Sequence, residues 1–125
     1  MTRLLRAFGP GLLWAGLLLF LGSRPNLSGP TVDLPIDKLV HFCLYGILGA
    51  LAGWGWSRHQ PPIGRGWPIL AAVLVGVGDE WHQRIVPGRS AELGDLIADA
   101  AGILVGFVLF SRRAATARER GADES

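Results

Sequence analysis

The sequence predicts an all-α fold, a polytopic helical bundle with four transmembrane helices. Half of the 125 residues are hydrophobic, only 18% are charged, and the apolar residues gather into four runs. Strict alternation of apolar and polar residues, which is typical of strands, is absent, and the segments between the runs are rich in Gly and Pro. Each run is close to, or slightly below, the roughly 20 residues that a helix needs to cross a bilayer core of about 30 Å. The shortness of the runs is the main objection to membrane-spanning helices. Composition alone does not decide the question, because it also fits a compact soluble core.

The first predicted helix covers residues 7–22 and follows two basic residues, Arg3 and Arg6. A charged start and an apolar run are also features of a secretory signal peptide. The segment "LGSRPN" offers no clear small-residue cleavage site, so we expect an uncleaved helix.

The other predicted helices cover residues 39–56, 67–81 and 93–110, separated by "SRHQPPIGRG" and "RIVPGRS". Together they form one domain, residues 1–111. The segments "GALAG" and "GILVG" each place two glycines one helical turn apart, which we interpret as ordinary close packing of helices. Residues 112–125 are charged, and we expect a solvated, frayed tail on the cytoplasmic side.

The positions of Lys and Arg predict that both termini lie in the cytoplasm, because basic residues are more frequent on the inner side. The inner side would receive Arg3, Arg6, Arg58, Arg65, Arg112, Arg113, Arg118 and Arg120. The outer side would receive Arg24, Lys38, Arg84 and Arg89. Tryptophans prefer the interfaces, and here Trp54, Trp56 and Trp67 would lie at the inner one and Trp81 at the outer one.

The net charge of +2 and the pI near 9.3 do not predict a nucleic-acid partner, because the basic residues form no stripe with interleaved aromatics. A single cysteine, Cys43, excludes an internal disulfide and a cysteine-based zinc cage. We expect membrane lipids as partners, together with a lipid-linked or cell-envelope ligand, and an oligomer is compatible with the sequence. The sequence identifies no cofactor.

Polar residues of three helices should meet on the outer side of the membrane. The second helix carries Asp37, His41 and Tyr45 at intervals of four, which puts them on one face. The third helix ends with Asp79, Glu80 and Gln83, the fourth begins with Asp95 and Asp99, and the connecting loop holds Arg89 and Ser90. A charge near the bilayer centre costs about 2.5–3.5 kcal/mol on insertion scales, so such residues usually face a bundle interior and pair.

Several of these residues also allow a plainer interpretation. Asp37 and Lys38 fit an ordinary pair at a helix start, because a carboxylate favours the positive end of the helix. Asp79 and Glu80 point about 100° apart on a helix, so we expect one to face the cluster and the other to pair with Arg84 or Arg89.

The segments "DKLVHFCLYGILG" and "DEWHQRIVPGRSAELGDLIADAAGILVG" resemble the VanZ-like family. The family pattern runs D-K-x-x-H-x-x-x-Y, then D-E-x-x-Q, then P-G-R-x-x-x-x-x-D-x-x-x-N/D-x-x-G, and the match spans residues 37–106. The resemblance implies a small integral protein of the bacterial inner membrane. The family is named for a determinant of low-level resistance to the glycopeptide teicoplanin, and the resemblance implies no particular reaction.

The resemblance assigns ten residues to motif positions: Asp37, Lys38, His41, Tyr45, Asp79, Glu80, Gln83, Arg89, Asp95 and Asp99. Asp99 takes the acidic alternative where many members have Asn, which makes the site more negative.

These residues suggest an outward-facing intramembrane site that binds or modifies a lipid or cell-envelope molecule. His41 is the candidate general base, oriented by Asp37, with Asp79 or Glu80 as a partner acid. Arg89 and Lys38 would hold an anionic headgroup. The remaining candidate binding residues are Tyr45, Gln83, Ser90, Asp95 and Asp99. Whether the protein is an enzyme stays open at this point.

Three alternatives remain open. A transporter is disfavoured for a single subunit, because "GALAGWGW" and "GILVGFVLF" offer no polar path through the inner half. A metal site would use His41 with Asp79, Glu80 or Asp99, but no local H-E-x-x-H spacing supports it. In the third alternative the polar groups only lock the helices together, and function lies with protein partners.

Overall fold

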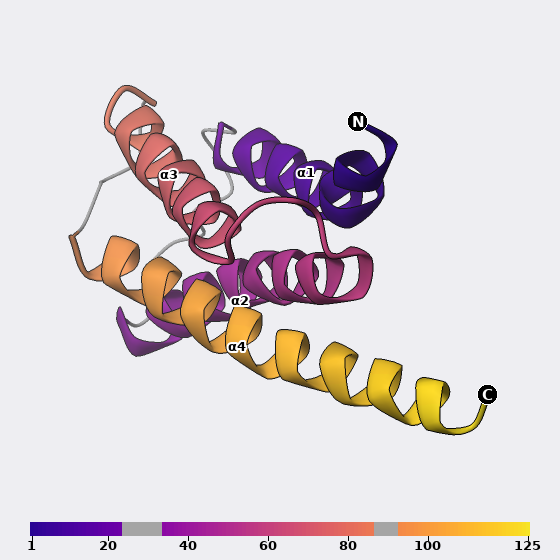
Figure 1. Cartoon of the computed structure of the whole chain (residues 1–125). Coiled ribbons are helices and arrows are strands. Elements are labelled where there is room, and N and C mark those ends of the chain that lie inside the picture. Colours follow the sequence, from indigo (N-terminus) through magenta and orange to yellow (C-terminus); the bar gives the residue numbers. More distant parts are fainter. Residues whose placement is uncertain (24–33, 87–92) are drawn as a thin grey trace.

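The computed structural model describes residues 1–23, 34–86 and 93–125, and this part of the chain is built from helices and short connections (Figure 1). The helices are α1 (Thr2–Gly22), α2 (Leu34–His59), α3 (Gly66–Gln83) and α4 (Leu93–Asp123). The all-α class and the four predicted helices are therefore confirmed. By length and composition, three segments of this described part could cross a membrane: Thr2–Gly22, Lys38–His59 and Leu93–Asp123.

The helices run beyond the ranges that the apolar runs predict. The largest difference is α4, which has 31 residues and continues through most of the charged segment at the end of the chain. The prediction of a frayed tail was wrong for residues 112–123, because Ala, Arg and Glu in this segment are strong helix formers even without an apolar face.

The shortest helix, α3, has 18 residues and does not meet the same criterion, because its last turns are polar. Its apolar part, residues 67–78, extends for only about 18 Å at 1.5 Å per residue. Asp79, Glu80 and Gln83 follow directly and are all buried. The apolar part of α3 is therefore shorter than the roughly 30 Å thickness of a bilayer core, and the polar end of the helix begins within that thickness.

The helices α2 and α4 form the central pair of the bundle; α1 packs on α2, and α3 packs on α4, α2 and α1 (Figure 1). Glycines let the two backbones approach closely. A Cβ atom added to Gly49 would collide with the backbone of Ile103, and one added to Gly106 would collide with the backbone of Gly46. Close backbone approach at small residues is the usual way in which helices associate in membranes.

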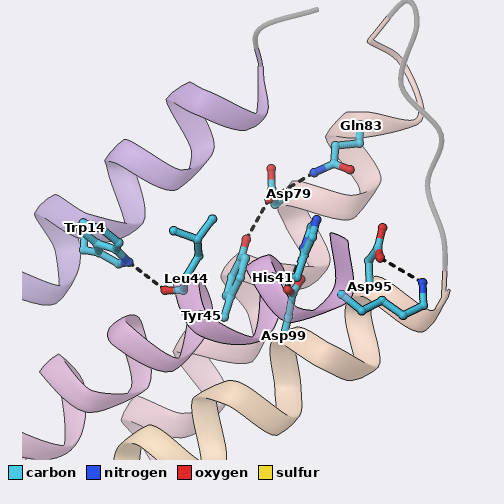
Figure 2. Close-up of polar contacts among 9 residues, drawn as sticks. Trp14, His41, Leu44, Tyr45, Asp79, Gln83, Asp95 and Asp99 are labelled. Atoms are coloured by element: carbon cyan, nitrogen blue, oxygen red, sulfur yellow. Dashed lines mark hydrogen bonds and ion pairs between the residues drawn. The ribbon is translucent and has the colours of Figure 1, made fainter. Parts of the chain in front are cut away.

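The first helix is attached to α2 by both packing and a hydrogen bond. The indole Nε1 of Trp14 donates to the backbone oxygen of Leu44 at 2.9 Å (Figure 2). Around this contact lies a small apolar core, which includes Ala15, Leu18, Leu48, Ala72 and Ile103.

The distribution of side chains is the reverse of that in a water-soluble protein. Large apolar residues are exposed on all four helices, for example Leu13 (79%), Ile47 (42%), Leu74 (57%) and Ile97 (61%). The buried carboxylates of the described residues are instead Asp79, Glu80, Asp95 and Asp99. Soluble proteins rarely expose so much contiguous apolar surface, so this arrangement favours a membrane protein over the compact soluble core that composition left open.

Candidate functional site

Side chains from α2, α3 and α4 meet near one end of the bundle (Figure 2). We call this group the polar cluster; its described members are Lys38, His41, Tyr45, Asp79, Glu80, Gln83, Asp95 and Asp99. Residues four apart on a helix share a face, which brings His41 and Tyr45 of α2 toward the same neighbours. The same spacing aligns Asp95 with Asp99 on α4.

The most buried member is Asp99, which is 1% exposed and hydrogen-bonds to His41. Its Oδ1 atom lies 2.9 Å from Nδ1 of His41, whose side chain is 16% exposed. The imidazole also stacks on the ring of Tyr45, with the ring centroids 6.5 Å apart and the planes at 3°. When Nδ1 carries the proton, the carboxylate fixes the orientation of the ring and Nε2 becomes its acceptor atom.

A second carboxylate, Asp79, accepts hydrogen bonds from both α2 and its own helix. The hydroxyl of Tyr45 donates to Oδ2 of Asp79 at 2.8 Å, and Nε2 of Gln83 donates to the same oxygen at 3.4 Å. Asp79 is 4% exposed and Glu80 is 6% exposed, so both carboxylates of the adjacent pair lie inside the protein. The contact of Asp79 with Tyr45 joins α3 to α2.

Lys38 lies at the rim of the cluster. Its Nζ atom is 3.4 Å from Oδ1 of Asp95, and the two side chains are 36% and 5% exposed. A Cβ atom on Gly94 would meet the end of the lysine side chain at 2.7 Å from Cε, so the absence of a side chain there makes room for this ion pair. The pair joins the start of α2 to the start of α4.

Oδ1 of Asp79 and Oδ2 of Asp99 are buried carboxylate oxygens that have no hydrogen-bond partner among the described residues. A buried polar atom of this kind costs free energy unless a proton, a water or a ligand satisfies it. These two atoms are therefore where a bound molecule would gain most from donating a hydrogen bond.

Three of the predicted site residues cannot be placed. The side chain of Asp37 and the loop residues Arg89 and Ser90 lie outside the described part of the chain. Asp37 was the predicted partner that orients His41, and this stays a prediction. Among the described residues, Asp99 hydrogen-bonds to His41, and the sequence suggested Asp99 only as a binding residue.

Two glycines that shape the cluster were missed by the sequence prediction. A Cβ atom on Gly22, at the end of α1, would collide with Oδ1 of Asp79. One on Gly76 would lie 3.6 Å from Oδ2 of Asp99 and 3.5 Å from the ring of Tyr45. Oδ1 of Asp79 and Oδ2 of Asp99 thus each lie beside a glycine of another helix. The spacing of residues within one helix does not predict such a contact between helices.

The metal-site alternative finds no support in the geometry. In residues 1–23, 34–86 and 93–125, no three His, Cys, Asp or Glu side chains are grouped so that they could hold a metal ion. The hydrogen bonds of His41 and Asp79 are instead to other side chains of the cluster.

In a comparison with protein families, the model described as VanZ/LLP1 matches residues 8–114. This range is most of the chain and contains every member of the polar cluster. Comparisons with curated proteins and with solved structures give no match.

Proposed function

Because the chain belongs to the VanZ/LLP1 family, we propose that it is a multi-pass membrane protein whose polar cluster binds or modifies a lipid or cell-envelope molecule. The observation that carries this proposal is the contact of His41 with the fully buried Asp99, together with the open second oxygen of that carboxylate. Ionisable groups inside a membrane protein are costly and usually serve a function.

The chemistry that suits this arrangement is proton transfer to or from a hydroxyl or amine of the ligand. A histidine held by a carboxylate can accept a proton at its other nitrogen, while the carboxylate stabilises the imidazolium that forms. Oδ1 of Asp79 and Oδ2 of Asp99 would accept hydrogen bonds from the ligand. Lys38 at the rim, and Arg89 from the loop, would attract an anionic group.

In this proposal both termini lie in the cytoplasm and the cluster opens toward the outer leaflet of the bacterial inner membrane. The asymmetric placement of arginine supports the orientation, since eight of the twelve Lys and Arg residues belong to the opposite end: Arg3, Arg6, Arg58, Arg65, Arg112, Arg113, Arg118 and Arg120.

The proposal is tested by identifying the lipids that co-purify with the protein from bacterial membranes. We expect the wild type to retain a distinct lipid species, and His41→Ala and Asp99→Asn to lose it while remaining helical and membrane-inserted. His82→Ala is the matched control, because His82 lies on α3 outside the cluster. Identical lipid profiles for wild type, His41→Ala and Asp99→Asn would contradict the proposal.

A link to glycopeptide resistance belongs to the same proposal, because a change in a cell-envelope molecule would alter susceptibility to such antibiotics. Expression of the wild type in a susceptible host should then raise the lowest inhibitory concentration of teicoplanin, and His41→Ala should abolish the increase. If the wild type and His41→Ala raise this concentration equally, resistance does not depend on the polar cluster.

A structural role is the second candidate, and the contacts between helices favour it. Side-chain hydrogen bonds join α2 to α3 and α4: Tyr45–Asp79, His41–Asp99 and Lys38–Asp95. If this is their whole function, Asp99→Asn and His41→Ala should lower the free energy of unfolding and leave the retained lipids unchanged. The same two variants thus distinguish the candidates.

A further inference from the structure

The end of the bundle opposite the polar cluster carries a basic pocket formed by three helices. It has a volume of about 510 Å³, within the range of roughly 300–1,000 Å³ that is common for small-ligand sites. Its cationic lining consists of Arg3 and Arg6 at the start of α1, Arg58 at the end of α2 and Arg118 on α4.

In residues 1–23, 34–86 and 93–125, none of these four guanidinium groups forms an ion pair with a carboxylate. Arg118 donates from Nη1 to the backbone oxygen of Ser57 at 3.3 Å, which ties α4 to the end of α2. Four cations gathered without counter-charges create a positive potential that attracts an anion.

The start of α1 adds to this potential. The helix begins at Thr2, which also lines the pocket, and no side chain caps its first backbone N–H groups. Helix N-termini carry a partial positive charge and bind phosphate groups well.

An exposed apolar surface leads from the membrane-facing part of the helices to the pocket. On α2, Trp54 and Ile47 precede Arg58 by four and eleven residues, which puts them on nearly the same face, and they are 40% and 42% exposed. On α1, Leu13 follows Arg6 by seven residues and is 79% exposed. The apolar side chains and the arginines thus follow one another along the helices, in the same order as the acyl chains and the phosphate of a phospholipid. A free phosphate ion has no apolar part that would use the first of these surfaces.

The position of Trp54 supports the same conclusion. Its ring meets that of His59, a pocket residue, edge to face, with centroids 5.8 Å apart. Tryptophan is enriched at the level of lipid headgroups, which sets the pocket at that depth.

We propose that this pocket binds the phosphate of an anionic phospholipid, whose acyl chains lie along Leu13, Ile47 and Trp54. Basic pockets between membrane helices are suited to acidic headgroups. Because the site is at the other end of the bundle, it is independent of the polar cluster and of any reaction there.

The test compares lipids retained by the full-length protein in vesicles of phosphatidylglycerol and phosphatidylcholine in equal parts. Native mass spectrometry would measure the ratio of the two lipids bound to the wild type and to Arg6→Ala/Arg58→Ala. Each cation near a membrane surface contributes about a fivefold preference for anionic lipid, so the double variant should reduce the ratio roughly 25-fold.

The control is Arg120→Ala, which removes one arginine charge from the same end of the bundle but outside the pocket. We expect its lipid ratio to remain near that of the wild type, and Arg6→Lys/Arg58→Lys to keep most of the preference, which also guards against misfolding of the alanine variant. Either an unchanged ratio in the alanine variant or an equal loss in Arg120→Ala would overturn the proposal. Displacement of phosphatidylglycerol by excess inorganic phosphate would show a site for the free ion and would also overturn it.

Discussion

The pairing of His41 with Asp99 is the most informative contact of individual residues in the protein. An ionised carboxylate accepts hydrogen bonds and cannot donate them. The side chain of Asn, which is the alternative at this position in the family pattern that the sequence resembles, can also donate. With Asp99 as the acceptor, Nδ1 of His41 is the natural donor across the 2.9 Å that separates the atoms. The acidic alternative at this position therefore favours one tautomer of the histidine.

We predict that Tyr45→Phe lowers the free energy of unfolding by about 0.5–2 kcal/mol, because Asp79 loses the hydroxyl that donates to it inside the bundle. Unfolding with increasing denaturing detergent would measure the change. Ser111→Ala, which removes an exposed hydroxyl bonded within its own helix, is the control and should change stability by less than about 0.5 kcal/mol. Equal stability of Tyr45→Phe and the wild type would mean that this bond does not stabilise the fold.

At this scale, sequence spacing predicts which residues share a helix face but not which partners they find. Intervals of four place His41 beside Tyr45 and Asp95 beside Asp99. The contact of His41 with Asp99 depends on how α2 and α4 cross and rotate. That geometry arises from packing between helices far apart in the chain, so the spacing within one helix does not contain it.

Among the helices, α2 and α4 make the closest contact, and glycine is what permits it. Along the crossing, Gly46 of α2 faces Gly102 and Gly106 of α4, while Gly49 and Gly53 of α2 face the backbones of Ile103 and Phe107. The glycine pairs in "GALAG" and "GILVG" predict close packing, but either could have faced α1 or α3. Only the structure shows that the two motifs pack against one another's helices.

We predict that Gly106→Ala destabilises the protein by about 1–3 kcal/mol or more, because the new methyl group meets backbone atoms of Gly46 and Ala50 that cannot move aside. Gly16→Ala in α1 is the matched change in open space and should stabilise by about 0.5–1 kcal/mol through higher helix propensity. Thermal unfolding of both variants in detergent would compare them. Similar melting temperatures would contradict the close contact of α2 with α4.

Helix ends were predicted less well than helix positions. The apolar runs locate all four helices, since burial and membrane exposure both require them. They do not locate the end of α4, because the helix continues through residues 112–123, which are not apolar and are little buried. This part is helical because Ala, Arg and Glu have a high helix propensity. A helix of 31 residues is about 46 Å long, so its last turns extend past a bilayer core.

As a whole, the molecule has two chemically different ends separated by apolar, outward-facing helix surfaces. One end holds the buried carboxylates of the polar cluster, and the other holds the exposed arginines of the basic pocket. The bias of basic residues is visible in the sequence. The pocket is not, because Arg3, Arg58 and Arg118 are brought together only by the arrangement of three helices.

We predict that a cysteine placed in the α2–α3 connection, Gly64→Cys, is protected in intact cells from a membrane-impermeant maleimide. Ile85→Cys, two residues after the end of α3 and 70% exposed, should react. Both would be made with Cys43→Ser, since the native cysteine is exposed. Permeabilised cells provide the control in which both react, and labelling of Gly64→Cys alone in intact cells would show the opposite orientation.

The short apolar part of α3 has a consequence for the bilayer itself. Beside α1 and α4 the hydrocarbon can keep its usual thickness, whereas beside α3 only about 18 Å of apolar helix precedes Asp79. Such hydrophobic mismatch costs fractions of a kcal/mol per Å and is relieved by local thinning or by entry of water. The bilayer should therefore be indented next to the polar cluster, so that headgroups of neighbouring lipids descend toward Asp79 and Asp99 and short-chain lipids are favoured around the protein.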